Sequence, residues 1–173
     1  MNRATAVRLI PLSIDVLDAE DRSTGELGAL LDVAVPSWPP LYHDAGVRAW
    51  FRARLLADPD AALWSGCYVV AVIDGVETLV GTAGYKGPPD AAGMVEIGYS
   101  IVEAYHRRGI GLGAVQQLVD KAFADVRVRT VTAETPVTFA ASRGLLERSG
   151  FSLTGTRIDP EEGELAVYGI VRS

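Results

Sequence analysis

The sequence predicts a mixed α/β (α+β) fold with a mostly antiparallel central sheet of about seven strands and helices on both faces. Three β-rich runs, residues 67–73, 78–85 and 94–102, follow one another in the middle of the chain. The first two are joined through Asp74-Gly75, a dipeptide typical of a tight hairpin. Further along, helical and β-rich patterns alternate. A meander followed by β-α-β crossovers produces a mixed sheet with helices on its faces.

The first third of the chain is expected to form one strand and two helices. Residues 4–12 are a candidate strand, and residues 24–35 carry apolar side chains at helical spacing before a proline-rich break. Asp44 is a suitable N-cap for the second helix, which ends before Pro59. We expect the buried side of that helix to carry Val47, Trp50, Phe51, Arg54 and Leu55.

The last third is expected to alternate helix and strand. Apolar residues at helical spacing predict the buried stripe of a helix: Leu112, Val115, Leu118, Val119, Ala122 and Phe123. The elements expected after it are a strand over residues 126–133, a helix over 138–149, and strands over 151–157 and 165–171. Gly150 is a good residue to end the helix before it.

Length and composition describe one globular domain spanning residues 1–173. The chain is 49% hydrophobic and 22% charged. Its net charge of −6 argues against nucleic acid as a partner, because phosphate contacts need a basic surface. An acidic balance instead mildly favours a cationic or amine-bearing substrate. No apolar run is long enough to span a membrane, and the first eight residues lack a secretory apolar segment.

The cysteine and histidine content bears on the cellular compartment of the protein and on whether it binds a metal. Cys67 is the only cysteine in the sequence, so no internal disulfide can form and a reducing compartment is indicated. One cysteine and two distant histidines, His43 and His106, cannot assemble a zinc site, and no metal is expected. We therefore expect a cytoplasmic protein. His43 is expected to be a loop residue rather than a catalytic one.

The most informative segment is Tyr105-His106-Arg107-Arg108-Gly109-Ile110-Gly111-Leu112-Gly113, which follows a β-rich run and opens an amphipathic helix. Its three glycines at alternate positions remove side chains from a turn, so backbone N–H groups can approach a ligand. Two arginines precede the helix N-terminus, where unpaired N–H groups and the positive end of the helix dipole favour an anion. This combination predicts a pyrophosphate site.

Three interpretations of this segment compete. A purely structural turn needs the glycines only for tight packing, but paired cations at a helix start favour a bound anion. A dinucleotide fold matches Gly109-x-Gly111-x-x-Ala114, with Glu134 suitably placed for a ribose contact. However, residues 103–108 separate the strand from the first glycine, and little chain follows to complete a doubly wound sheet. Within this second interpretation, a phosphate loop of the NTPase type is weaker still, because no Gly-Lys-Ser/Thr follows.

The third interpretation rests on a resemblance to a family. The stretch Val95-Glu96-Ile97-Gly98-Tyr99-Ser100-Ile101-Val102, followed after three residues by His106-Arg107-Arg108-Gly109-Ile110-Gly111, resembles the acetyl-CoA motif of the GNAT superfamily of N-acetyltransferases. That motif has the core pattern Gln/Arg-x-x-Gly-x-Gly/Ala. A second segment, from Ala141-Ser142-Arg143 to Gly150-Phe151, resembles the family's Asn-x-x-Ser … Gly-Phe segment with matching spacing. The Glu-Ile-Gly-Tyr strand and the Ser-containing helix are similar to the branch of ribosomal-protein N-terminal (alanine/serine) acetyltransferases.

The resemblance implies a GNAT-like sheet and acetyl-CoA as cosubstrate. It places the CoA pyrophosphate on the amides from Arg107 through Gly113, with pantetheine lying along the preceding strand as an added pseudo-strand. A backbone N–H near Ile101 would stabilise the oxyanion. His106 stands where the family usually has Gln or Arg, and it can still donate to a phosphate. The implied cofactor-binding residues are Ile101, Val102, His106, Arg107, Arg108, Gly109, Ile110, Gly111, Leu112 and Gly113.

The implied reaction is direct attack of a primary amine on the thioester, which requires a base because amines are mostly protonated at neutral pH. Glu96 is the candidate base, and the alternative is a carboxylate on a solvated strand face. Ser142 occupies the family position of a thiolate proton donor, and the alternative is an ordinary polar residue in the first turns of a helix. Two residues depart from the family pattern: Phe139 replaces the usual Asn, and Leu146 replaces a tyrosine that protonates the thiolate in many members.

Two function classes follow. The leading one is an N-acetyltransferase whose acceptor is a protein N-terminal α-amine or a small-molecule amine. The alternative is a catalytically silent acetyl-CoA-binding sensor or interaction domain, which Phe139 and Leu146 keep open. Residues 36–44 and 87–93 are expected to be the loops that select the acceptor. A homodimer is a candidate assembly, whereas nucleic acid and membrane are not expected partners.

Overall fold

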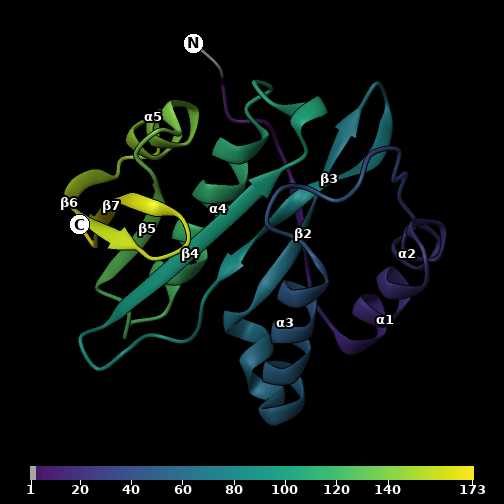
Figure 1. Cartoon of the computed structure of the whole chain (residues 1–173), viewed down its shortest axis with the longest axis horizontal. Helices are drawn as coiled ribbons and strands as arrows, with labels where there is room; N and C mark the ends of the chain where they lie inside the picture. Colours follow the sequence, from purple (N-terminus) through teal and green to yellow (C-terminus); the bar gives the residue numbers. More distant parts are fainter. Residues whose placement is uncertain (1–2) are drawn as a thin grey trace.

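The computed structural model describes residues 3–173, which form five α-helices around one seven-stranded sheet (Figure 1). Short 3-10 turns occur at Pro59–Trp64 and Glu103–Tyr105. In chain order the other elements are β1 (Arg8–Pro11), α1 (Ile14–Arg22), α2 (Thr24–Leu31), α3 (Ala45–Ala57), β2 (Gly66–Ile73), β3 (Val76–Tyr85), β4 (Met94–Ile101), α4 (Ile110–Ala124), β5 (Thr130–Pro136), α5 (Ala140–Arg148), β6 (Ser152–Asp159) and β7 (Gly163–Val171).

The strands of the sheet are ordered β1-β2-β3-β4-β5-β7-β6. Among the described strands, only β4 and β5 are parallel neighbours, and the other neighbouring pairs are antiparallel. The parallel pair needs a long crossover, which contains α4, whereas β2 and β3 are joined through Asp74 and Gly75. Both turn residues have positive φ, as a two-residue hairpin of this kind requires. The predicted mixed, mostly antiparallel sheet is confirmed.

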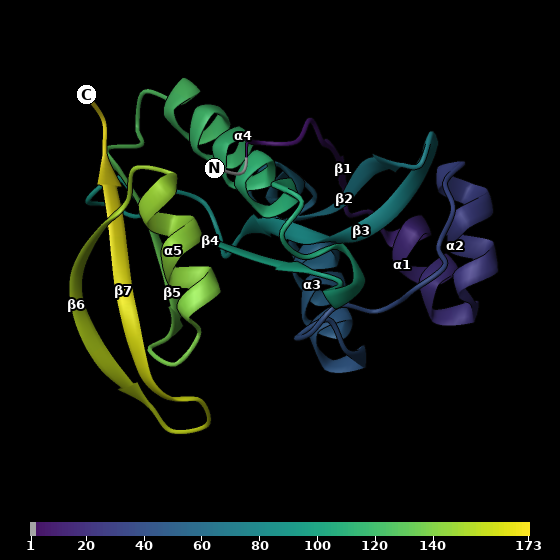
Figure 2. The same cartoon turned by 90° about the horizontal axis from the view of Figure 1, so that it is seen from above.

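Helices pack on both faces of the sheet and create two apolar cores. Helices α4 and α5 bury Leu118 and Leu146 in a cluster that includes Ile97 of β4. On the other face, α1, α2 and α3 surround Leu17 and Tyr68. Figure 2 shows α4 on one side of the first strands and α1–α3 on the other. This arrangement gives the two faces of β4 different surroundings.

Helix α1 is an addition to the elements expected from the sequence. It is only nine residues long, with Val16, Leu17 and Ala19 buried, and Asp15, Asp18 and Asp21 recur every three residues on the other side. The local signal for this helix is Ser13, whose hydroxyl accepts a hydrogen bond from the Val16 N–H at 3.3 Å. The helix ends at Ser23, whose hydroxyl in turn caps α2.

Helices α2 and α3 differ in part from expectation. Helix α2 ends at Leu31 rather than at residue 35, because Asp32 takes a left-handed conformation with φ of 55°. Asp44 caps α3 as expected, accepting from the Val47 N–H at 2.9 Å. The expected burial of Trp50 is wrong, since this side chain is 44% exposed. Beside the apolar cluster that α3 shares with α1, Arg48 and Arg52 of α3 form ion pairs with Asp18 and Asp21 of α1.

The first strand is shorter than expected, because residues before Arg8 run along α4 instead of joining the sheet. The Thr5 N–H donates to the Gly109 carbonyl oxygen at 2.9 Å. The Val7 carbonyl oxygen accepts from the Gln117 side chain at 2.6 Å. The N-terminal segment, defined here as residues 3–7, therefore lies across the turn that precedes α4.

Candidate active site

The parallel strands β4 and β5 pair over only part of their length. Their ladder runs from Met94 opposite Thr130 to Ile97 opposite Ala133. Beyond Ile97, β4 continues in register with β3 alone, while β5 continues with β7. The ends of the two central strands therefore diverge, and β5 offers no ladder hydrogen bonds to residues 98–101. An extended ligand could pair with β4 there as an extra strand.

The turn between β4 and α4 has the geometry of an anion site. Gly109 is the N-cap of α4, with φ of 75° and no side-chain cap. The Gly113 N–H makes the first intrahelical bond, to the Gly109 oxygen at 3.1 Å. The N–H groups of Ile110, Gly111 and Leu112 precede that bond and have no acceptor within the helix. They lie at the positive end of the helix dipole, as the sequence predicted.

The glycines of this turn also have a packing role, which the structural interpretation of the segment expected. A Cβ atom on Gly109 would lie 2.0 Å from the Arg3 carbonyl oxygen, and one on Gly113 would lie 2.1 Å from the Thr5 oxygen. Both glycines thus make room for the N-terminal segment. A Cβ on Gly111 would instead meet the end of the Leu145 side chain of α5, at 2.6 Å.

His106 connects the turn to the end of β4. Its Nε2 atom lies 2.7 Å from the Ile101 carbonyl oxygen, so Nε2 is the donor. That oxygen is therefore already engaged, and an added strand would use the other backbone groups at the end of β4. Arg107 has φ of 61°, and the Arg108 guanidinium carbon lies 5.9 Å from the centre of the Tyr105 ring.

Ser142 lies close to a residue to which the sequence assigned no role. The Tyr99 hydroxyl reaches from β4 to α5, where it is 2.8 Å from Ser142 Oγ and donates to the Ser142 carbonyl oxygen at 3.3 Å. Burial raises the pKa of Tyr99 to about 12. Two hydroxyl groups are thus joined beside the divergence of β4 and β5.

The two departures from the family pattern have different surroundings. Leu146 is fully buried in the core beneath α5 and has no polar group to offer. Phe139 precedes α5 and is 40% exposed. The paired hydroxyl groups of Tyr99 and Ser142 are therefore the proton-bearing side chains that join β4 to α5 in this part of the site.

Glu96 lies on the face of β4 opposite Val95 and Ile97, which point into the core beside α4. Its carboxylate forms an ion pair with Lys86, and the Glu96 side chain is 31% exposed. On neighbouring β5, Glu134 binds the Arg157 guanidinium through both carboxylate oxygens. Arg157 holds the pKa of Glu134 below its ordinary value. Glu134 is thus fixed in an ion pair rather than being free to contact a ribose.

Replacing Arg157 with Gln should reduce the acid sensitivity of the fold. A carboxyl with a lowered folded-state pKa stabilises the protein fully above its ordinary pKa of 4.5, and this stabilisation is lost as the pH falls through the lowered value. The free energy of unfolding, measured with urea, should therefore differ between wild type and R157Q at neutral pH and converge in acid. A difference that stays constant across this range would contradict the assignment.

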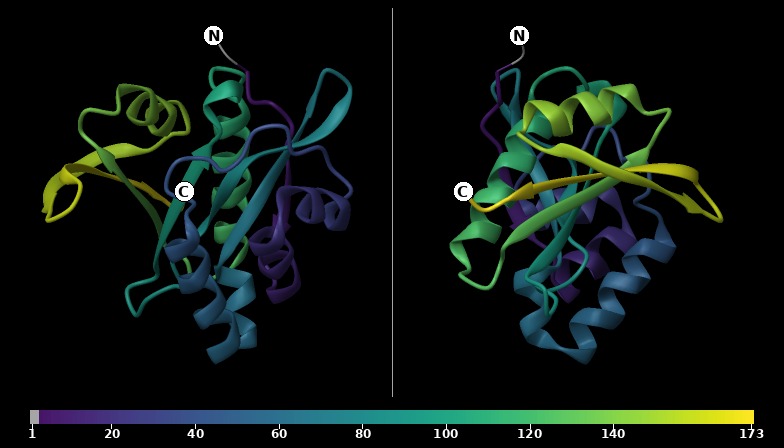
Figure 3. Two further views of the ribbon diagram at one scale, coloured as in Figure 1. Left: turned by 45° about the vertical axis from the view of Figure 1, so that its right-hand side comes forward. Right: turned by 90° about the vertical axis from the view of Figure 1, so that its left-hand side faces the viewer.

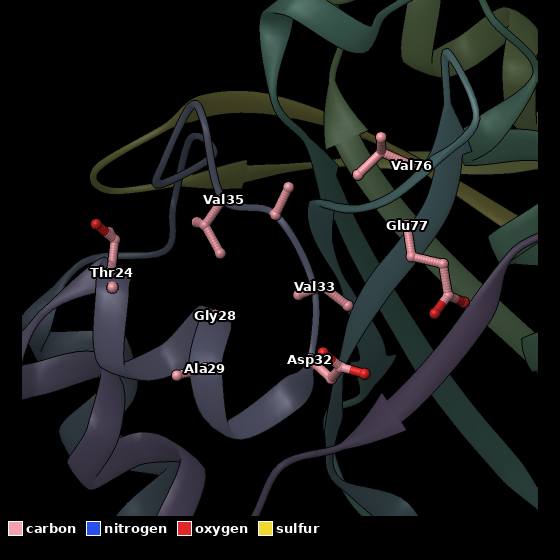
Figure 4. A pocket seen from close by; sticks show the side chains of 10 residues that line it. Thr24, Gly28, Ala29, Asp32, Val33, Val35, Val76 and Glu77 are labelled. Carbon is pink, nitrogen blue, oxygen red and sulfur yellow. The ribbon is translucent and has the colours of Figure 1, made fainter.

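A separate surface hollow of about 480 Å³ lies between α2 and the start of β3 (Figure 4). Residues 24–35 line one side and Val76 and Glu77 the other. The hollow shares no residue with β4, α4 or α5. The helix N-terminus that lines it, at Thr24 and Gly25 of α2, is already capped by the Ser23 hydroxyl, unlike that of α4. We therefore place the candidate site at the β4–α4 turn.

Residues 3–173, the described part of the chain, contain the helices that bear on a membrane span and all the acidic, His and Cys side chains that bear on a metal site. No helix in this range has both the length and the apolar character needed to cross a membrane. The same range contains no group of three or more His, Cys, Asp or Glu side chains arranged to hold a metal ion. Cys67 is a free, buried thiol whose pKa is raised by burial.

Comparison with known proteins identifies the family. A family model described as an acetyltransferase (GNAT) domain matches residues 8–152. The uncharacterized N-acetyltransferase YjdG of Bacillus subtilis (strain 168) is 33% identical over 150 residues, which covers 85% of this chain and 86% of that protein. The chain therefore belongs to the GNAT family, whose members are acetyl-CoA-dependent acyltransferases.

Solved structures share the same fold. The microcin C7 self-immunity acetyltransferase MccE, in complex with acetyl-CoA and AMP, has a TM-score of 0.68 at 14% identity, covering 96% of this chain and 93% of MccE. RimL, a ribosomal L7/L12 α-N-protein acetyltransferase, in complex with coenzyme A, has a TM-score of 0.67 at 17% identity, covering 97% of this chain and 95% of RimL. The neighbours thus include the ribosomal-protein acetyltransferases that the sequence resembles.

Proposed function

We propose that this protein is an N-acetyltransferase that transfers the acetyl group of acetyl-CoA to a primary amine, either a protein N-terminal α-amine or the amine of a small molecule. The observation that carries the proposal is the divergence of β4 and β5 beside the uncapped N-terminus of α4. These features offer strand pairing for pantetheine and N–H donors for a diphosphate within one connected segment. The acetylated amine in RimL is, by its name, a ribosomal-protein α-amine.

The cofactor-binding residues in this proposal are those expected from the sequence, apart from Val102. The diphosphate accepts hydrogen bonds from the N–H groups between Arg107 and Gly113, and the Arg108 guanidinium adds positive charge beside them. Pantetheine pairs with the end of β4 beside Ile101. Val102, which the sequence also suggested, has its N–H bonded to the Val80 oxygen and its oxygen bonded to the Tyr105 N–H, so it takes no part in this pairing. The His106 ring orders the turn through its hydrogen bond to the Ile101 oxygen.

The chemistry follows from the two faces of β4. Glu96 lies on the open face and removes a proton from the ammonium group of the acceptor, directly or through water. The free amine attacks the thioester carbonyl carbon, the carbon–sulfur bond breaks, and the thiolate of CoA leaves. Ser142, hydrogen-bonded to Tyr99, donates a proton to that thiolate. As the amide forms, the attacking nitrogen releases its second proton to water, and that proton restores the Ser142 hydroxyl, directly or through the Tyr99 hydroxyl.

The direct test mixes the protein with acetyl-CoA and a panel of amines, including peptides with free N-termini and small polyamines, and follows free thiol. We expect thiol release that depends on the amine, together with a mass increase of one acetyl group on the acceptor. Acetyl-CoA binding without thiol release across the whole panel would favour the catalytically silent alternative.

Tyr99→Phe should lower kcat by about tenfold while leaving acetyl-CoA affinity within about twofold. The substitution keeps the ring and removes only the hydroxyl that contacts Ser142. If the two hydroxyl groups act as a unit, the double variant Y99F/S142A should be no slower than S142A alone. Stopped-flow measurement of thiol formation tests this, and fully multiplicative losses would contradict a shared role.

A further inference from the structure

The most heavily hydrogen-bonded buried charge in the described chain is Glu20, on helix α1. Its side chain is 3% exposed. One carboxylate oxygen, Oε1, accepts from the Trp38 indole N–H at 2.7 Å and lies 2.8 Å from His43 Nε2. The other, Oε2, accepts from the Tyr68 hydroxyl. The Arg48 guanidinium approaches Oε1 to 3.9 Å. Nothing in the proposed chemistry uses this cluster.

Burying a carboxylate is costly unless hydrogen bonds and charges compensate it. Burial alone would raise the pKa of Glu20, but the hydrogen bonds from His43, Tyr68 and Trp38 outweigh it and lower the pKa. The carboxylate is therefore held in its charged form. An apolar side chain of similar size could fill this position without that cost. Stability alone therefore does not explain why a carboxylate stands here.

Two of the hydrogen-bond partners of Glu20 belong to one loop, which indicates what the carboxylate does. Trp38 and His43 come from the two ends of a loop that we call the α2–α3 loop, residues 36–44. This loop crosses in front of the sheet between α2 and α3 (Figure 3). His43 is buried, and its ring packs edge-on against Trp38 with centroids 5.5 Å apart. One carboxylate thus fixes the loop at both ends.

Between these two fixed points the loop turns outward. Leu41 and Tyr42 are 61% and 49% exposed, and Tyr42 has φ of 65°. The pKa of Tyr42 is raised by partial burial and by the negative charge of Glu162 in the β6–β7 turn. The tip of the α2–α3 loop therefore lies toward the β6–β7 turn, on the face of the sheet where α1–α3 pack and to which Glu96 points.

We propose that Glu20 is a positioning residue for the acceptor amine: by holding Trp38 and His43, it fixes the α2–α3 loop so that Leu41 and Tyr42 form one wall of the acceptor site. This inference rests on the proposed acetyltransferase function. It assigns a role in acceptor binding to a residue that touches neither acetyl-CoA nor the reacting atoms.

The test compares Glu20→Met with Glu20→Gln. Met keeps the volume and removes both acceptors, whereas a Gln amide oxygen can still accept from Trp38 and His43. We expect E20M to raise the KM for the acceptor about tenfold, with kcat and acetyl-CoA affinity near wild type. In E20Q the KM for the acceptor should lie close to the wild-type value. Glu26→Gln, which removes an exposed carboxylate from α2, is the matched control and should leave all three unchanged.

A second measurement does not depend on turnover. Chymotrypsin cleavage after Leu41 or Tyr42, followed by mass spectrometry, should be about tenfold faster in folded E20M than in wild type and near the wild-type rate in E20Q. If the wild type acetylates no amine, the proposed function fails, and this cleavage rate alone decides whether Glu20 holds the loop. Equal cleavage in E20M and wild type overturns the proposal.

A merely structural role for Glu20 predicts a different pattern. Acetyl-CoA affinity and kcat would then fall together with acceptor binding, and this result would overturn the proposal. If E20M does not fold, Leu41→Ala provides the test, because it removes only an exposed side chain of the loop tip. L41A should raise the acceptor KM at unchanged acetyl-CoA affinity, and an unchanged acceptor KM would show that the loop is not a wall of the site.

Discussion

Gly111→Asp should weaken acetyl-CoA binding about 100-fold, or about 2.8 kcal/mol, measured by titration calorimetry. The new carboxylate would lie in the first turn of α4, among the N–H groups proposed to bind the diphosphate, and like charges in a partly enclosed site repel strongly. The folded protein itself should tolerate the charge, because a carboxylate at a helix N-terminus interacts favourably with the dipole.

Gly111→Asn is the matched control for that variant. Asn has nearly the same size and meets the same Leu145 methyl group, which lies at the end of a flexible side chain. We expect G111N to lose much less affinity than G111D. Equal losses in the two variants would show that shape, rather than charge, explains the effect, and unchanged affinity in G111D would remove the turn from the site.

Glu96→Gln should lower kcat/KM by about 100-fold without changing acetyl-CoA affinity. General bases contribute roughly this factor or more to proton transfer, and Gln keeps the shape of the side chain while removing its basicity. The loss should shrink at high pH, where more of the acceptor amine is already deprotonated. Initial rates measured across a pH series give both results.

Lys86→Gln separates catalysis from the ion pair. It removes the cation that contacts Glu96 but leaves the carboxylate on β4. If Glu96 is the base, K86Q should retain most of kcat/KM. A loss in K86Q as large as that in E96Q would show that the ion pair itself, on a solvated strand face, is what the enzyme needs.

The sequence predicted best those features that are encoded locally. The Asp74-Gly75 hairpin, the Asp44 cap and the turn before α4 each depend on residues close together in the chain, and the structure contains all three. Helix α1 was missed because it is only nine residues long, has few apolar side chains, and buries the charged Glu20 among them. Burial of Trp50 was wrong because the ionic contacts of α3 with α1 cannot be read from α3 alone.

The candidate site was predicted only in part, because some of its features are encoded locally and others depend on residues far apart in the chain. The turn proposed to bind phosphate is a continuous segment, so its residues could be found from their order. The contact between Tyr99 and Ser142 joins residues 43 positions apart. The Glu20 cluster joins α1, the α2–α3 loop and β2. The packing of Arg3 and Thr5 over Gly109 and Gly113 spans more than a hundred residues. Such contacts depend on the assembled sheet and leave no local signal.

The central claim is that the turn preceding α4 binds the diphosphate of acetyl-CoA and so presents the thioester beside Tyr99 and Ser142. A crystal structure of the protein with acetyl-CoA tests it most directly. The account predicts diphosphate oxygens within hydrogen-bond distance of the N–H groups between Gly109 and Gly113, with pantetheine paired to the end of β4. A diphosphate bound elsewhere, with that turn occupied only by the protein's own side chains, would contradict it.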